Sequence, residues 1–228
     1  MILDPYTWHD ATIAERTYES PDAVSLRVSL PSSYRYRPGQ HAIVKLVLPD
    51  GTSTLRQYSF ASSPRSGTVW LTIVRSPGGV VSSWAIDKAA VGDRLEVSQP
   101  FQGPLCQFVN PLRHVTMIAG GSGVVPIMSH LRDLRLRQQS TPITVLYSCR
   151  SAARCFETEL VASAPHETII RRETDLTTRF SPSEITAHIT DDTTVFICGS
   201  RGFVTAMRDV VYKASPTTPI FAEAFSLD

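Results

Sequence analysis

The decapeptide MIAGGSGVVP, residues 117–126, is the part of the chain that indicates its fold most strongly. An apolar run passes there into a glycine turn, and a proline follows where the first turn of a helix accepts it. Glycines at such a turn let backbone N–H groups approach a phosphate, whose negative charge a helix N-terminus favours. The dinucleotide fingerprint has a third glycine where Pro126 stands, so this is not that fingerprint. Taken alone, the stretch fits a phosphate-binding loop and a plain strand-to-helix turn equally well.

The residues after this stretch alternate between apolar strands and helices. A capping box at residues 181–184, SPSE, starts one helix, and the spacing of Phe203, Met207 and Val211 predicts another. Strands are expected at residues 115–119, 143–149, 168–171, 194–198 and 219–222. Alternating elements of this kind predict a parallel sheet that is covered on both faces.

The residues before the stretch have a different rhythm. Residues 24–30 alternate strictly between apolar and polar side chains, as a half-buried strand does. Turn signals separate further strands, expected at 41–48, 57–61, 68–74 and 94–98, and one short helix is expected at 83–88. Many short strands with such turns indicate an antiparallel sandwich or barrel. We therefore predict a β domain at residues 1–106 and an α/β domain at residues 107–228.

Composition and charge exclude several classes of protein. The 228 residues carry 22 basic and 21 acidic side chains, for a net charge of +1, so we expect neither nucleic-acid binding nor a polybasic membrane patch. The longest nearly apolar stretch, residues 115–128, is too short to span a bilayer and is broken by glycines. The N-terminus lacks the features of a secretory signal. We therefore expect a cytoplasmic protein without membrane insertion.

The four cysteines, Cys106, Cys149, Cys155 and Cys198, are scattered and form no CxxC pair. A disulfide framework, a zinc site or an iron–sulfur cluster is therefore not expected. The six histidines are dispersed as well, so the sequence predicts no metal site.

Two stretches of the first domain carry residues suited to a phosphorylated ring compound. On the strand at residues 55–60, Arg56 can grip a phosphate while Tyr58 offers a flat surface to a ring; an ordinary surface strand is the alternative. At residues 75–84, two glycines precede Ser82, which is expected to cap the short helix and to make a second anion site. A plain helix cap is the alternative there.

Two stretches of the second domain stand near its expected ligand-binding edge. Cys198-Gly199 ends a predicted parallel strand, and ligands of such sheets bind at the carboxyl ends of the strands. The alternative is that the cysteine only packs in the core. The stretch Phe221–Phe225 lies near the C-terminus, where an aromatic side chain is commonly a frayed or a core residue.

Together, and in this order and spacing, the stretches resemble the ferredoxin–NADP reductase superfamily. Arg56–Ser59 is similar to its RxYS flavin motif, and Gly78–Ser82 is similar to its flavin-phosphate loop. Gly120–Pro126 looks like its GGxGxxP nucleotide loop, Cys198-Gly199 like its CG motif, and Glu223–Phe225 like the ExF ending of many bacterial members. The resemblance implies an antiparallel Greek-key flavin-binding barrel followed by a doubly wound parallel-sheet nucleotide-binding domain.

The same resemblance implies an oxidoreductase that takes hydride from NAD(P)H onto FAD and passes electrons to a separate acceptor. A ferredoxin, a flavodoxin or an oxygenase component would be the protein partner, and no fused iron–sulfur domain is expected. FMN is the less favoured flavin. The stretch Pro100–Pro104 carries an extra residue compared with the usual turn of the family, at the place where the adenine end of FAD would bind. Ser200 stands where the family often has a proline.

Roles for individual residues are also implied by the resemblance. Tyr58 would pack against the isoalloxazine ring, Arg56 and Ser82 would hold the flavin phosphates, and Ser59 would hydrogen-bond near flavin N5. Cys198 would position the nicotinamide. The implied catalytic residues are Ser59, Cys198, Glu223 and Phe225. The implied cofactor-binding residues are Arg56, Tyr58, Ser59, Phe60, Thr72, Val74, Gly79, Val80, Val81, Ser82, Gly120, Gly121, Gly123, Pro126, Arg150, Ser151, Arg154, Cys198, Gly199 and Phe225.

The choice between NADH and NADPH depends on the residues after the second strand of a dinucleotide domain, which read the adenine ribose. Arg150 and Ser151 stand there with Arg154 close behind, and no carboxylate appears before Glu157. Two guanidinium groups favour the 2′-phosphate of NADPH. Alternatively, Arg150 stacks on the adenine, as an arginine can in an NADH enzyme.

Two other functions stay open. The chain could be a flavin- and nucleotide-binding electron-transfer subunit of a larger complex without independent turnover, or a nucleotide-binding module without flavin. The colour of the purified protein separates the second of these from the others. Turnover with a small artificial acceptor separates an independent enzyme from a subunit.

Overall fold

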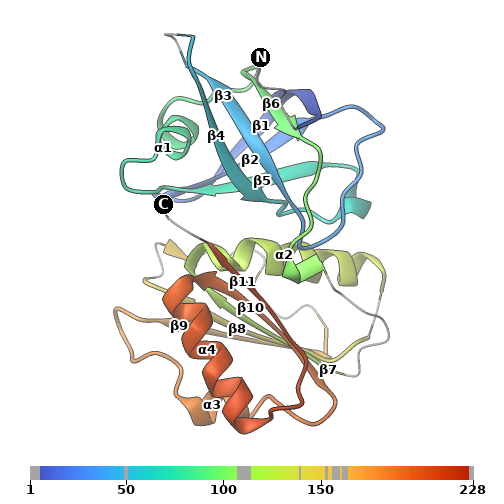
Figure 1. The fold of residues 1–228 in the computed structure, drawn as a ribbon, viewed down its shortest axis with the longest axis vertical. Helices are drawn as coiled ribbons and strands as arrows, with labels where there is room; N and C mark the ends of the chain where they lie inside the picture. The colour runs from blue at the N-terminus through green and yellow to red at the C-terminus, as the bar shows by residue number, and fades with distance from the viewer. Residues whose placement is uncertain are drawn as a thin grey trace.

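The computed structural model describes residues 6–48, 51–106, 114–138, 140–151, 154–155, 160 and 164–225. A six-stranded antiparallel sheet lies above a five-stranded parallel sheet, and helix α2 (Val124–Leu136) runs between the two (Figure 1). This arrangement confirms the predicted fold class. The boundary between residues 106 and 107 stays a prediction, because residues 107–113 lie outside the described residues.

The first sheet closes into a barrel. Its neighbouring strands are antiparallel, in the order β4-β3-β6-β1-β2-β5. The two outer strands approach each other where Phe60 bridges to Leu71 and the Ala61 N–H donates to the Trp70 carbonyl at 2.8 Å. The strands are β1 (Trp8–Ser20), β2 (Ala23–Ser29), β3 (His41–Val47), β4 (Ser53–Ser59), β5 (Val69–Val74) and β6 (Arg94–Ser98). Helix α1 (Val80–Asp87) and the 3₁₀ helices η1 (Pro64–Ser66) and η2 (Pro104–Cys106) complete this part.

The second sheet is parallel, in the order β11-β10-β7-β8-β9. Its strands are β7 (His114–Gly120), β8 (Ile143–Cys149), β9 (Glu167–Glu173), β10 (Thr193–Ser200) and β11 (Ile220–Phe225). Helix α2 covers the face toward the barrel, and α3 (Pro182–Thr186) and α4 (Arg201–Ala214) cover the other (Figure 1). The strand order reverses between β7 and β10, so their carboxyl ends form the switch point at which such sheets bind ligands.

The helix signals read from the sequence are present. The Ser181 hydroxyl accepts from the Glu184 N–H, and the Glu184 carboxylate accepts from the Ser181 N–H, which confirms the capping box. On α4, Met207 and Val211 are buried against the sheet, as the helical spacing predicts. Residues 121–123 form the short 3₁₀ helix η3, which leads into α2, so Pro126 stands in the first turn of that helix.

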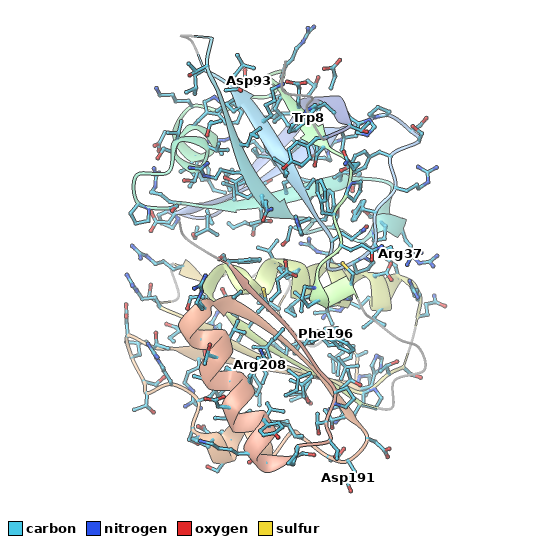
Figure 2. The ribbon with its side chains drawn as sticks, viewed as in Figure 1. Trp8, Arg37, Asp93, Asp191, Phe196 and Arg208 are labelled. Atoms are coloured by element: carbon cyan, nitrogen blue, oxygen red, sulfur yellow. A yellow bond between two sulfur atoms is a disulfide. The ribbon has the colours of Figure 1, made fainter. Side chains whose placement is uncertain are left out.

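Helix α2 joins the two sheets through buried contacts. The His130 Nε2–H donates to the Leu105 carbonyl at 3.0 Å, and the Ser129 hydroxyl donates to the Ser62 carbonyl at 2.7 Å. On its other side the His130 ring lies 5.5 Å from the ring of Phe196, which Figure 2 labels within the lower sheet. Burial lowers the pKa of His130 to about 4. The junction between the sheets is therefore packed around a neutral histidine.

Strand β1 was missed by the sequence reading. Its thirteen residues are mostly polar, and only Ala11 and Ile13 are buried. Irregularities at Ile13/Glu15 and Tyr18/Ser20 shift its register against β2. Each shift breaks the strict alternation on which strand prediction relies.

The cysteines require a second correction. Cys149 and Cys155 form a disulfide, with their Cα atoms 5.5 Å apart. The scattered spacing of the cysteines had predicted no disulfide framework. Strand β8 ends at Cys149, and Cys155 lies beside it in the buried cluster under α2. The remaining two, Cys106 and Cys198, are free thiols.

Candidate functional site

A cleft of about 440 Å³ lies between the barrel and the second sheet, a size suited to a small-molecule ligand. Its walls come from β3, β4, β5, the α1 loop, the start of α2 and the end of β11. The predicted site residues that line it are Arg56, Tyr58, Ser59, Thr72, Val74, Gly79, Val81, Ser82, Glu223 and Phe225. His41, Leu55, Gln57, Ser76, Ser122, Val125 and Ala224 line it as well.

Strand β4 supplies a cation and an aromatic ring side by side. Arg56 is exposed, and its guanidinium donates to the Leu55 carbonyl at 2.7 Å; within the described residues it has no carboxylate partner. Tyr58 is half-buried, and burial raises the pKa of its phenol to about 12, so the ring stays neutral. Ser59 is buried at the end of the strand. This side of the cleft can therefore bind a phosphate and a flat ring together.

Helix α1 begins earlier than predicted, and Ser82 does not cap it. The N-cap is Gly79, which makes no side-chain cap bond. Ser82 is instead the third helical residue, and its hydroxyl accepts from the Ser76 N–H at 3.1 Å and donates to the Gly79 carbonyl at 3.2 Å. A Cβ at Gly79 would lie 2.6 Å from the Ser82 Oγ. The serine therefore fastens the loop to the helix and leaves the first-turn N–H groups without a side-chain cap.

Each glycine at residues 120–123 is required, or permitted, for a different structural reason. A Cβ at Gly123 would collide with the Cys198 carbonyl, and one at Gly120 would lie 2.9 Å from the Phe203 ring. Gly121 has a left-handed φ of +55° and open space where a Cβ would stand. The loop reaches the cleft through Ser122. Packing of helix against strand therefore requires Gly123, whereas Gly121 is the glycine that exposes backbone.

The carboxyl ends of β10 and β11 lie side by side, with Cys198 paired in register to Glu223 and Ser200 to Phe225. Cys198 is fully buried in the core, and burial raises the pKa of its thiol. Glu223 and Phe225 line the cleft, whereas Cys198 does not. Cys198 therefore lies behind the cleft wall, whereas Glu223 and Phe225 on the neighbouring strand β11 face the cleft.

Two buried polar atoms beside the cleft lack partners. His41 Nδ1 lies 3.8 Å from Glu223 Oε1, and neither His41 Nδ1 nor Glu223 Oε2 has a hydrogen-bond partner in the described part of the chain. Burial raises the pKa of Glu223 and lowers that of His41. The sequence reading missed His41, because only strand pairing places it opposite Ser59.

The other predicted residues lie away from the cleft wall. Phe60 is fully buried in the barrel core, where its ring stacks on Tyr36 with centroids 4.1 Å apart. Val80 is exposed at the start of α1. Neither residue is among those that line the cleft, and their roles in cofactor binding stay predictions.

The predicted ribose residues come directly after strand β8. Arg150 is exposed, and it has no ion pair among the described residues. Arg154 lies 2.9 Å from Asp22, in the turn between β1 and β2 of the barrel. Of the two arginines that were predicted to act together, only Arg154 is therefore held by an ion pair in the described part of the chain.

Within the described residues, no group of three or more His, Cys, Asp or Glu side chains is arranged to hold a metal ion. No helix among those residues combines the length and apolarity that crossing a bilayer requires.

Part of the chain matches a known protein family. Residues 10–109 match the family described as oxidoreductase FAD-binding domain. This match covers less than half of the chain. The complete chain is similar in fold to a ferredoxin NADP+ reductase from Neisseria gonorrhoeae, with a TM-score of 0.81 at 19% identity over 97% of this chain and 99% of that one. The family match at residues 10–109 supports the predicted resemblance to the ferredoxin–NADP reductase superfamily, and the solved structure shows a shared fold.

Two curated relatives extend this comparison. Reductase component 1 of a terephthalate 1,2-dioxygenase from Comamonas sp. is 33% identical over 62% of this chain and 41% of its own length. NADH oxidoreductase HCR from Escherichia coli K12 is 28% identical over 92% of this chain and 65% of its own length. The chain thus spans less than two thirds of the length of either relative.

Proposed function

We propose that the chain is an NAD(P)H-dependent flavoprotein reductase that binds FAD, accepts hydride and passes electrons to a separate acceptor. One observation carries the proposal: a single cleft brings together the Arg56–Ser59 strand, the uncapped start of α1 and the Glu223–Phe225 end of β11. A phosphate site, a ring platform and a proton-holding group thereby face one space.

The cleft fits FAD in its donor chemistry. The Arg56 guanidinium has no carboxylate partner within the described residues, and the first turn of α1 offers backbone N–H groups to an anion. Gly79 keeps that loop free of a side chain, and the Tyr58 ring stands beside the arginine for the isoalloxazine. Thr72 and Val74 of β5 bound the space between them.

Bound FAD supplies the hydride acceptor and releases electrons singly. The chain's residues hold and orient the reacting groups and exclude water. The carboxyl of Glu223 can hold a proton at Oε2, since burial raises its pKa, and the nearby Nδ1 of His41 can accept one. Because His41 pairs with Ser59 in register, this pair adjoins the hydroxyl proposed to face flavin N5.

The nicotinamide nucleotide is proposed to enter at the switch point between β7 and β10. Gly121 exposes backbone there, and Ser122 lines the cleft. Cys198 acts behind the wall as a positioning residue, since its carbonyl packs against Gly123. Phe225 lies at the cleft, where it is proposed to cover the flavin until the nicotinamide displaces it.

A protein electron acceptor, such as an oxygenase component, is proposed as the partner. The support comes from relatives, which are named reductase components of a terephthalate dioxygenase and of a propane 2-monooxygenase. The chain itself is proposed to divide into a flavin domain at residues 1–106 and a nucleotide domain at residues 107–228.

The test begins with the purified chain and added FAD. After gel filtration we expect a yellow protein with one FAD, whose visible absorbance bleaches on anaerobic addition of NADH or NADPH and which reduces a small artificial acceptor. Arg56→Ala should lower FAD affinity about tenfold or more through the loss of charge-assisted bonds. Arg94→Ala removes an exposed arginine of β6 outside the cleft lining and should bind FAD as the parent does.

Three results would contradict the proposal. A protein that retains neither FAD nor FMN would be a nucleotide-binding module at most. A yellow protein that neither nucleotide reduces would not be a reductase. Reduction without turnover of the artificial acceptor would indicate a subunit that works only within a complex.

A further inference from the structure

The loop after β8 is held in place from two sides. The Cys149–Cys155 disulfide ties the end of β8 to a residue six positions later in the chain. At its start, the carbonyls of Cys149 and Arg150 accept from the N–H groups of Thr174 and Asp175 at 2.9 and 2.8 Å. The loop is thereby tied to the segment after β9.

The second constraint comes from the barrel. The Arg154 guanidinium lies 2.9 Å from Oδ2 of Asp22, and Oδ1 of the same carboxylate lies 3.6 Å from Arg75 Nε. The backbone of Asp22 is held as well, because the Arg75 N–H donates to the Asp22 carbonyl at 2.8 Å. Arg75 in turn makes two bonds to Asp87, at 2.7 and 2.8 Å. The carboxylate of Asp22 is therefore positioned by its own domain and draws Arg154 toward the barrel.

These contacts bear on the choice of nucleotide, an inference that rests on the proposed reductase function. The residues after the second strand of a dinucleotide domain read the 2′ position of the adenine ribose. Of the two arginines there, Arg150 is unpaired within the described residues, while Arg154 is engaged by Asp22. A 2′-phosphate must compete with this carboxylate for Arg154 and is repelled by its charge; a 2′-hydroxyl experiences neither penalty.

We propose that Asp22, on the flavin domain, is a specificity-determining residue that restrains the preference for NADPH by holding Arg154. The nucleotide domain alone would present two arginines to a 2′-phosphate. In the assembled molecule, Arg150 has no ion pair among the described residues, whereas Arg154 is ion-paired with Asp22. The effect is modest, because both side chains are partly exposed and exposed ion pairs are weak.

The variant Asp22→Asn tests this directly, because it keeps the shape of the side chain and removes its charge. We expect the ratio of kcat/KM for NADPH to that for NADH to rise about three- to fivefold, mainly through a lower KM for NADPH. Calorimetric titration with 2′-AMP, measured without turnover, should show a similar gain in affinity, and titration with 5′-AMP should not.

Two further variants locate the cause. Asp87→Asn removes a carboxylate from the same network at a residue that contacts Arg75 and not Arg154, so it should leave the ratio unchanged. The double variant Asp22→Asn/Arg154→Ala should lose the gain, because Arg154 carries it. Thermal unfolding of each variant confirms that it folds.

The proposal is overturned if Asp22→Asn leaves both the ratio and 2′-AMP affinity at the parent values, or if the gain survives in the double variant. A parent that neither nucleotide reduces would contradict the proposed function, and the 2′-AMP titration would then decide the role of Asp22 on its own.

Discussion

The two sides of the cleft are built in different ways. The flavin wall, formed by Arg56–Ser59 and Gly79–Ser82, presents side chains and N–H groups that have few other partners. The other side, here called the nucleotide wall, reaches the cleft with Ser122 and Val125. Behind them lie Gly120, Gly123, Cys198 and the loop residue Arg154, which are already engaged by packing or by Asp22, and the Cys149–Cys155 disulfide. Substitutions on the flavin wall should therefore affect ligand binding first, and those on the nucleotide wall should affect the fold as well.

The largest effect is expected from Gly123→Ala on the nucleotide wall. The new Cβ would overlap the Cys198 carbonyl and lie 2.6 Å from the Gly199 nitrogen, and backbone atoms cannot move aside cheaply. We expect a loss of more than about 3 kcal/mol of unfolding free energy, or failure to fold. Urea unfolding followed by circular dichroism measures it.

The control for this variant is Gly202→Ala on α4, where a Cβ would meet nothing within 4 Å. It should be neutral or stabilise by up to about 1 kcal/mol, as alanine favours a helix. If Gly123→Ala folds as stably as the parent and loses only nucleotide binding, the glycine serves the ligand and the contrast between the walls fails.

The second prediction concerns the junction that keeps the walls together. The folded-state pKa of His130, about 4, lies below its ordinary value of 6.5 because of burial. Between pH 7 and pH 4 the unfolded chain therefore binds a proton that the folded chain does not. Stability contributed by the neutral histidine is present above pH 7 and lost as the pH falls through this window, by about 3 kcal/mol.

The measurement is the urea midpoint of unfolding as a function of pH. His130→Gln keeps a donor for the Leu105 carbonyl and cannot be protonated, so its curve should fall less steeply between pH 7 and pH 4. Parallel curves for parent and variant would show that His130 does not cause the acid sensitivity.

The third prediction concerns the disulfide of the nucleotide wall. Reducing the Cys149–Cys155 bond with a dithiol should lower unfolding free energy by about 2 kcal/mol, since the ring that it closes is short. The freed loop should raise KM for the nucleotide by about three- to tenfold, while flavin content stays constant. A Cys155→Ser variant should behave like the reduced protein and be insensitive to dithiol. Equal KM values before and after reduction would show that the loop is ordered without the bond.

The smallest effect is expected from His41→Asn beside the flavin wall. It removes the group that faces Glu223 at 3.8 Å and leaves the carboxyl in place, so proton transfer should slow by less than about tenfold. The pH profile of turnover should change shape, and FAD content should not. An unchanged profile would return His41 to a packing role against Phe101, whose ring it stacks on at 5.9 Å.

Most of the flavin wall could be predicted from the sequence, because its residues act through side chains that a motif names. Arg56, Tyr58 and Ser59 line the cleft as expected. Phe60 does not, since the barrel closes there and draws its ring into the core. His41 escaped notice because its position depends on pairing between strands that the sequence does not specify.

The nucleotide wall was harder to predict, because its motif mixes packing with binding. Gly121 and Gly123 look alike in the sequence, yet one exposes backbone and the other accommodates the Cys198 carbonyl. Arg154 looked free for a phosphate, and its partner Asp22 lies 132 positions earlier in the other domain. The disulfide joins Cys149 and Cys155, whose spacing matches no residue pattern that signals a bond.

Direct hydride transfer across the cleft underlies the proposed reaction, and a rapid-mixing experiment can detect it. The FAD-loaded chain is mixed anaerobically with NADH and NADPH, each with and without deuterium at nicotinamide C4, and flavin absorbance is monitored. We expect bleaching that is slower with the deuterated nucleotide, because the transferred hydrogen leaves C4 as the two rings meet. A chain that binds FAD stoichiometrically yet shows no bleaching with either nucleotide would contradict hydride transfer in this cleft.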